Sequence, residues 1–255
     1  MKKVLFAVAL LILISVGFCG CINFDSTPAG PEVISYFEDE YDADENSILS
    51  VSTVNGLISI NSWDGEKIAL NATKRSRYGE DDLKNAEIVV SENGDEINIE
   101  IQHSSPIRSR AVDLVIKIPN NVTVKFVSST NGGITVENVD GYVEATTLNG
   151  GIDIIGTTGI GNLVSTNGGI SAELFDITED IDIENTNGGV TLFINPIINA
   201  SIQISTTNGG ITVDGEFITE TESTYNSFSG ILGNGGNSIN VVTTNGGITI
   251  NELII

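Results

Sequence analysis

Apolar and polar residues alternate along most of the chain after residue 47, which is the period-2 pattern of β-strands. The turn pairs Asn55-Gly56, Asp64-Gly65 and Asn93-Gly94 separate the first runs of alternation. No segment beyond the first twenty or so residues shows the 3.6-residue period of an amphipathic helix. The pattern therefore predicts an all-β fold, with early strands at Ile48–Val54, Lys67–Thr73, Ala86–Ser91, Glu96–Ile101, Ala111–Ile118 and Val122–Ser128.

From residue 122 the alternation is organised around a recurring Asn-Gly-Gly tripeptide. Successive tripeptides are spaced 18, 18, 20, 21 and 37 residues apart, and the last spacing suggests two periods with a degenerate or inserted coil between them. A period near twenty residues is typical of solenoids, in which each coil buries its apolar side chains against its neighbours. We expect a β-solenoid of ~18–21-residue coils. Its structural corners would be Asn131, Gly132 and Gly133; Asn149, Gly150 and Gly151; Asn167, Gly168 and Gly169; Asn187, Gly188 and Gly189; Asn208, Gly209 and Gly210; and Asn245, Gly246 and Gly247.

The composition of the tripeptide suits a stacked corner. Asparagine amides can form a ladder from coil to coil, and glycine adopts positive φ without a steric penalty. A rival interpretation is a series of hairpins, because Asn-Gly between alternating hydrophobic residues is also a strong hairpin signal. We favour the solenoid because a hairpin needs only some permissive turn, whereas here the same tripeptide returns almost unchanged.

The glycine-rich motif does not match the known ligand-binding loops. A phosphate-binding loop needs Lys followed by Ser or Thr after its glycines, and then a helix, whereas strands are predicted after these corners. A calcium-binding nonapeptide array needs Asp where Gly233–Val241 has Asn and Ser. We expect the tripeptide to be structural, with no metal site and no cofactor beyond weak binding of divalent cations.

The N-terminus has the features of a secretory signal. Lys2 and Lys3 precede an apolar run, Val4–Ile14, and the segment Phe18-Cys19-Gly20-Cys21 resembles a lipoprotein processing site. We expect cleavage after Gly20 and lipidation of Cys21, so residues 1–21 form the signal segment. The alternative is an uncleaved membrane anchor, although spanning requires ~20 apolar residues. Either version places the rest of the chain outside the cytoplasm, attached to the membrane of the cell envelope.

The segment that follows is rich in turn-forming and acidic residues. It contains STPAGPE and then EDEYDADE, a composition that buries little apolar surface. We therefore expect residues 22–47 to be a flexible acidic tether and residues 48–255 to be the solenoid domain.

Charge narrows the choice of partners. The chain has 34 acidic and 11 basic residues, and Lys125 is the last basic one. Such a surface repels phosphate backbones, which excludes nucleic acid. It favours cations or cationic peptides, and the alternative is that it serves solubility alone.

The region from Val112 to Ile154, VDLVIKIPNNVTVKFVSSTNGGITVENVDGYVEATTLNGGIDI, resembles a known family. This is the family of bacterial and archaeal envelope proteins called putative adhesins, a domain of unknown function. The final segment, ILGNGGNSINVVTTNGGITI, is similar to the pattern that closes that family's domain. The resemblance extends over residues 47–255 and implies a β-solenoid-like fold, an envelope location and a role in adhesion. It implies no catalytic residue.

Few residues could carry catalytic chemistry. His103, the only histidine, is expected to be exposed in a loop, and as a general base it would need an oriented nucleophile. Trp63 is expected to pack beside a turn, with carbohydrate stacking as the alternative. Lys74, Arg75, Arg77, Arg108 and Arg110 form one basic cluster, which is expected to neutralise the chain's own acids.

Asp180, Asp182 and Glu184 are the candidate acidic binding face, because they project from one side of a predicted strand. Paired carboxylates could also serve polysaccharide cleavage, but only if they lie ~5–9.5 Å apart in a cleft. We expect a non-enzymatic binding or adhesion scaffold whose partner is an envelope polymer, a glycan or a cationic peptide. A receptor or decoy for cationic peptides is the second hypothesis and a polysaccharide-active enzyme the third.

Overall fold

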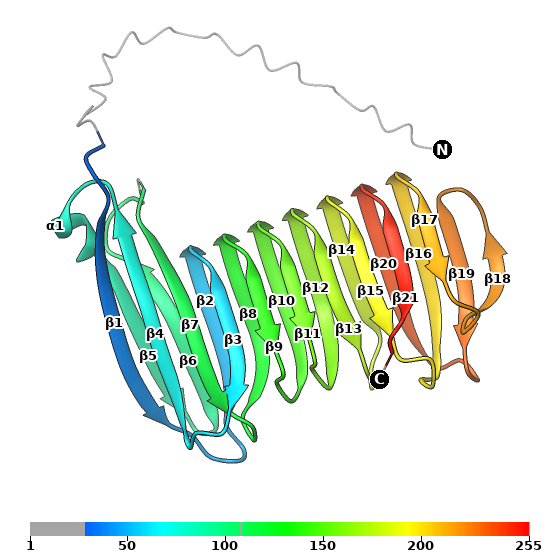
Figure 1. Ribbon diagram of the computed structural model, residues 1–255, viewed down its shortest axis with the longest axis horizontal. Coiled ribbons are helices and arrows are strands. Elements are labelled where there is room, and N and C mark those ends of the chain that lie inside the picture. Colours follow the sequence, from blue (N-terminus) through cyan, green and yellow to red (C-terminus); the bar gives the residue numbers. More distant parts are fainter. Residues whose placement is uncertain (1–28, 108, 255) are drawn as a thin grey trace, which may run out of the picture.

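The computed structural model describes residues 29–107 and 109–254, and Figure 1 shows a long stack of strands in two layers. The strands form one ten-stranded and one eleven-stranded sheet, here called sheet 1 and sheet 2. The all-β prediction is confirmed. A single short helix, α1 (Glu80–Leu83), lies within the described residues.

Sheet 1 contains, in spatial order, β1 (Val33–Asp42), β4 (Lys67–Ser76), β7 (Ala111–Pro119), β3 (Ile58–Trp63), β9 (Ile134–Glu137), β11 (Ile152–Ile155), β13 (Ile170–Leu174), β15 (Val190–Ile194), β21 (Ile248–Glu252) and β17 (Ile211–Asp214). Sheet 2 contains β18 (Thr219–Ser223), β19 (Ser227–Leu232), β16 (Ala200–Asn208), β20 (Asn237–Asn245), β14 (Ile181–Asn187), β12 (Gly159–Asn167), β10 (Tyr142–Asn149), β8 (Thr123–Asn131), β2 (Ile48–Asn55), β6 (Glu96–His103) and β5 (Ala86–Asn93).

Each coil contributes one strand to each sheet, and its corner joins the two sheets at one edge of the stack. Corresponding strands of neighbouring coils pair in parallel, with Asn149 opposite both Asn131 and Asn167. The two strands that flank a corner belong to different sheets, so the corner is not a hairpin turn. Parallel sheets need both faces covered or strongly polar, and here the second sheet covers the inner face of the first.

The alternating aliphatic residues fill the space between the sheets. Ile134, Ile152 and Ile170 stack in register on sheet 1 and are almost fully buried, as are Val143 and Leu163 on sheet 2. The residues between them on each strand point outward. The core is therefore one continuous cluster that runs the length of the stack.

The order of coils in space differs from their order in the chain at both ends. The coil β20–β21 lies between β14–β15 and β16–β17, so the corner at Asn245 stacks between Asn187 and Asn208. The coil expected between residues 208 and 245 is therefore absent. The β18–β19 hairpin stands there instead and extends sheet 2 beyond β16.

The opposite end shows the same kind of rearrangement. The coil β2–β3 lies between β6–β7 and β8–β9. Antiparallel strands lie beyond β6–β7, namely β4 and then β1 on sheet 1, and β5 on sheet 2. The tether predicted for residues 22–47 is wrong over Val33–Asp42, because these residues form β1. An acidic strand is stable there because its backbone pairs with β4 while its carboxylates stay in water, and Phe37 and Tyr41 pack against the core.

The predicted signal segment, including Cys21, and most of the predicted tether before β1 lie outside the described residues. Within residues 29–107 and 109–254, no helix is long and apolar enough to cross a membrane.

Candidate functional site

The corner asparagines form a hydrogen-bonded ladder along one edge of the stack. Each side-chain amide donates from Nδ2 to the Oδ1 atom of the preceding rung, over distances of 2.6–2.9 Å. The ladder begins at Asn55, where the sequence predicts only a turn. Its spatial order is Asn55, Asn131, Asn149, Asn167, Asn187, Asn245 and Asn208.

A second ladder lies inside the corner and was not predicted. The residue two positions before each corner asparagine points inward and donates to the carbonyl of the first glycine in the neighbouring coil. Thr147 Oγ1 donates to Gly132 O over 3.0 Å, and Ser165 Oγ donates to Gly150 O over 3.0 Å. The pattern Ser/Thr/Asn-x-Asn-Gly is visible in the sequence and could have revealed this contact. Thr53 of the first coil has no such partner, because the coil beyond it has no glycine corner.

The two glycines of each corner have different roles, which corrects the expectation that both supply positive φ. The first glycine is required by close approach: a Cβ on Gly150 would lie 2.2 Å from Gly132 O, and one on Gly168 would lie 2.1 Å from Gly150 O. The second glycine is less crowded: the nearest atom would lie 3.5 Å from a Cβ on Gly169 and 3.3 Å from one on Gly151 or Gly189. In the first coil, Leu57 occupies this second position.

An open groove crosses four coils on the outer side of sheet 1, next to the corners. Its volume is about 540 Å³. The second glycines leave its floor without side chains, and its polar walls are hydroxyl and carboxylate groups. Its polar lining residues come from corresponding positions on β9, β11, β13 and β15, namely Thr135, Asp153, Ser171 and Thr191.

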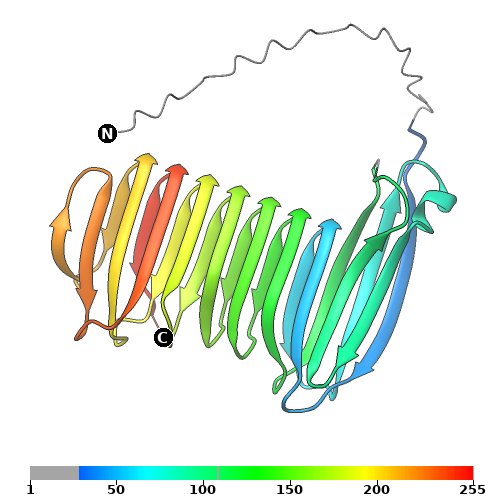
Figure 2. The same ribbon diagram turned by 180° about the vertical axis from the view of Figure 1, so that it is seen from behind.

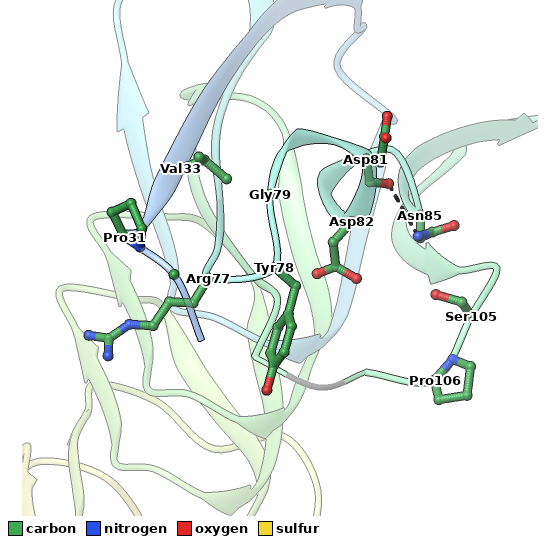
Figure 3. Close-up of a pocket in the computed structure, with 11 residues that line it drawn as sticks. Pro31, Val33, Arg77, Tyr78, Gly79, Asp81, Asp82, Asn85, Ser105 and Pro106 are labelled. Carbon is green, nitrogen blue, oxygen red and sulfur yellow. Dashed lines mark hydrogen bonds between the residues drawn. The ribbon is translucent and has the colours of Figure 1, made fainter. Parts of the chain in front are cut away.

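A larger cleft of about 640 Å³ lies at the end of the stack that carries β1 and α1, and Figure 3 shows its lining. Pro31 and Arg77 lie on one side, while Asp81 and Asp82 of α1 lie on another. Arg77 and the two aspartates bring both signs of charge to the rim, so the cleft has no single electrostatic preference.

Behind this cleft, Arg110 is fully buried and joins three segments of the chain. Its guanidinium donates to Asp82 Oδ1 over 2.7 Å, to Ser105 O over 3.0 Å and to His103 Nδ1 over 3.2 Å. A buried charge is tolerated when it is paired and hydrogen-bonded in this way. The cluster is therefore a structural clamp at this end of the stack.

His103 is not the exposed loop residue that we expected. It ends β6 and is half-buried, with the fully buried Arg110 donating to its ring nitrogen. Burial and the neighbouring Arg110 charge lower the pKa of its imidazole, against a smaller opposing effect of Asp82. It packs against the clamp and has no nucleophile beside it among its described contacts.

Two other basic residues of the predicted cluster, Arg75 and Lys74, make contacts within the chain. Arg75 pairs with Asp113 over 2.6 Å, and Lys74 Nζ donates to Ala86 O over 2.7 Å. Trp63 packs beside its turn, where Nε1 donates to Lys67 O and Lys117 Nζ lies 5.7 Å from the ring centroid. Arg108 lies outside the described residues.

Asp180, Asp182 and Glu184 lie at β14, exposed on sheet 2. The structure uses two of them between coils: Asp180 Oδ1 accepts from Ser238 N over 2.7 Å and Asp182 Oδ1 accepts from Asn240 Nδ2 over 3.0 Å. The hydrogen bonds from Ser238 lower the pKa of Asp180. In the described part of the chain, no three His, Cys, Asp or Glu side chains converge where they could hold a metal ion.

The fold has relatives among solved structures. A putative cell adhesion protein from Clostridium sporogenes is 15% identical, with 86% of this chain and 100% of that chain covered and a TM-score of 0.50. A putative adhesin from Bacteroides fragilis is 16% identical, with 86% and 97% covered and a TM-score of 0.44. At this identity the first likeness concerns the fold alone. None of the curated proteins compared with the chain matches it in sequence. The model of the Toastrack family, DUF4097, matches residues 44–251, and the chain therefore belongs to this family.

Proposed function

We propose that the protein is a non-enzymatic binding scaffold, anchored at the cell envelope, that holds an extended polymer in the groove on sheet 1. The observation that carries the proposal is the groove itself, which crosses four coils and presents a similar polar position on each. Parallel strands are ~4.8 Å apart, so a polymer lying along the stack meets hydrogen-bonding groups at a regular interval.

The chemistry of the groove favours a glycan or another hydroxyl-rich envelope polymer. Thr135, Ser171 and Thr191 can donate and accept hydrogen bonds, and Asp153 is a strong acceptor. The bare glycine floor allows close approach of a flat ring or a chain. Many weak contacts on neighbouring coils add up when one ligand spans them. The N-terminal lipid or uncleaved anchor would keep the stack at the membrane.

The second hypothesis, a receptor for cationic peptides, is favoured by a different observation. All 15 acidic residues after Lys125 lie in a stretch without any Lys or Arg. Such a field attracts cations over a distance of ~8 Å at physiological salt. Binding by this field alone would therefore weaken steeply as salt rises, whereas hydrogen bonding in the groove would weaken little.

The groove is tested with the full mature protein on an array of glycans and cell-wall fragments, followed by affinity measurement at low and high salt. Gly169→Tyr places a ring in the middle of the groove at a position where a Cβ is tolerated. We expect it to weaken the bound glycan at least tenfold while the unfolding midpoint stays near that of the parent. The matched control is Gly210→Tyr, which lies on the last coil, beyond the groove, with nothing within 4 Å of its Cβ position.

Three results would overturn the proposal. These are unchanged glycan binding in Gly169→Tyr, equal losses in both variants, and an array without any bound glycan. Release of shortened glycan products would instead favour the enzyme hypothesis.

A further inference from the structure

Within the described residues, sheet 1 ends at two edge strands, β1 and β17, and β17 is the one that directly terminates the stack of corners. Sheet 2 continues past β16 with β19 and β18, whereas sheet 1 stops at β17, the other strand of the same coil. Figures 1 and 2 both show the β18–β19 hairpin standing beyond the last coil. Sheet 2 therefore projects two strands, β19 and β18, beyond sheet 1. The space beside β17 and below these two strands is here called the step.

The backbone of β17 has hydrogen-bonding groups that point into this step. Ile248 N donates to Gly210 O, so the backbone N–H and C=O groups of the even-numbered residues of β17 point toward β21. Because N–H and C=O groups alternate sides along a strand, those of Ile211 and Val213 face away from it. In an inner coil the equivalent donor, Ile170 N, reaches Gly189 O of the next coil over 3.0 Å. Among the described residues, no next strand exists for Ile211.

The core is also incompletely covered at this edge. Ile211 and Val213 point inward but remain half-exposed, while their counterparts Ile248 and Ile250 on β21 are buried. Phe217 and Ile218, from the connection to β18, pack partly against the core beside them. An added strand would cover the inward apolar residues and satisfy the free backbone groups at the same time.

The charged residues around the step favour a strand with basic side chains. Asp214 on β17, Glu216 just after it and Glu252, whose carboxylate lies beside Gly215, are exposed at this edge, and the chain has no Lys or Arg after residue 125. Exposed edge strands are often protected by charge, and here the protection has one sign only. A strand with basic residues on its outer face complements this field, and a strand with acidic ones is repelled.

A second copy of this chain fits the step poorly. Two-fold pairing of β17 with β17 would bring both projecting β18–β19 hairpins into the same space above the joined sheet, since sheet 2 lies on one side of sheet 1 in each copy. A single strand avoids this overlap.

We propose that the β17 edge binds an extended peptide segment of another protein, in which aliphatic residues alternate with lysine or arginine. The peptide adds a strand to sheet 1, as in other cases of strand addition. Its aliphatic side chains face the core beside Val213 and Phe217, and its basic side chains lie on the outer face of sheet 1, on the side of Asp214. This site is separate from the groove on sheet 1, so it does not depend on the groove binding a glycan.

The experiment uses the full mature protein and a labelled eight-residue peptide of alternating lysine and valine, with capped ends. We expect binding of this peptide, and none of the version with glutamate in place of lysine. Two further versions are N-methylated at every lysine or at every valine. One of them must lose the hydrogen bonds to β17, so one should bind about tenfold or more weakly while the other is less affected.

Two variants test the edge from the protein side. Val213→Pro removes an outward-facing N–H at an edge position that tolerates proline, and we expect it to weaken the peptide about tenfold. The triple change Asp214→Asn, Glu216→Gln and Glu252→Gln should weaken it as well. The matched control removes three charges from β14 with Asp180→Asn, Asp182→Asn and Glu184→Gln, and should have the smaller effect.

Several outcomes would overturn the site. These are equal binding of both N-methylated peptides and the parent peptide, equal losses in the two triple variants, absence of peptide binding, and a concentration-dependent dimer that Val213→Pro abolishes. The N-methylated peptides keep the test decisive if Val213→Pro fails to fold.

Discussion

The two ends of the stack meet the same problem with different structures. At the first end, β1 and β4 close sheet 1, β5 closes sheet 2, and the buried Arg110 joins α1 to the segment before β7. At the other end, β19 and β18 extend sheet 2 while β17 is left as a short open edge. Solenoids need terminal caps because an uncovered coil exposes apolar side chains and backbone groups. The first end is thus closed by antiparallel strands and a buried ion pair, whereas the second ends in the β17 edge, where we propose that a peptide binds.

The largest effect is expected from the clamp. Arg110→Met should lower the free energy of unfolding by about 3–5 kcal/mol, because the Asp82 carboxylate, only 13% exposed, would lose its ion pair and keep only Ser76 Oγ, and the Ser105 carbonyl would lose its donor. Chemical denaturation measures the total, and amide hydrogen exchange at residues 79–86 reports whether this end loosens first.

The control for the clamp is Arg75→Met, which breaks the more exposed pair with Asp113. Partly exposed pairs contribute about 0–1 kcal/mol, so this variant should stay near the parent. Equal losses in the two variants would contradict the assignment of Arg110 as a clamp.

The second prediction compares an inner coil with the last one. Gly168→Val should cost about 2–4 kcal/mol, because its Cβ would overlap the Gly150 carbonyl in a ladder fixed on both sides. Gly209→Val meets a similar overlap, with Gly246 O at 2.0 Å, but its coil has no neighbour beyond β17 and can shift. We expect a smaller cost for Gly209→Val. Thermal and chemical unfolding of both variants check this, with Gly169→Ala as the tolerated control.

The sequence is sufficient to predict the coils but not their order. Alternation of aliphatic residues predicts inward positions such as Ile152 and Ile154, which are buried as the period requires. The order of the last coils could not be predicted, because TTNGGIT occurs both at residues 206–212 and at residues 243–249. Identical corners stack equally well on Asn187, so only the β18–β19 hairpin and the lengths of the connections distinguish them.

The sites that follow the repeat could be predicted from the sequence, and those outside the repeat could not. The outer asparagine ladder follows from repetition, whereas the Arg110 clamp depends on contacts among residues 82, 103, 105 and 110 that no period relates. The four-residue α1 is too short to show a helical period. The coil β2–β3 was missed as a rung because Leu57 replaces the second glycine, which the structure shows to be dispensable there.

The third prediction concerns the asparagine ladder and has a smaller effect. Asn149 donates to Asn131 and accepts from Asn167, whereas Asn208 only donates, to Asn245. Each exposed bond contributes about 0.5–1.5 kcal/mol at most, so Asn149→Ala should cost about twice as much as Asn208→Ala. Urea unfolding of the two variants measures the difference, and equal costs would mean that the last rung has a further contact.

The smallest effect distinguishes the two ends by pH, because the only histidine lies at the first end. Arg110 Nε donates to His103 Nδ1, so the neutral ring must carry its proton on Nε2. Protonation of Nδ1 removes that acceptor and places a second cation beside the guanidinium, and burial together with Arg110 lowers the pKa below the usual 6.5. In the unfolded chain the histidine takes up a proton first as the pH falls, so the folded state loses stability below about pH 6.5 and keeps it above.

His103→Gln retains an acceptor for Arg110 and does not titrate. The unfolding midpoint of the parent should therefore fall relative to His103→Gln between pH 7 and pH 5, and a constant difference over that range would show that His103 does not couple the clamp to pH.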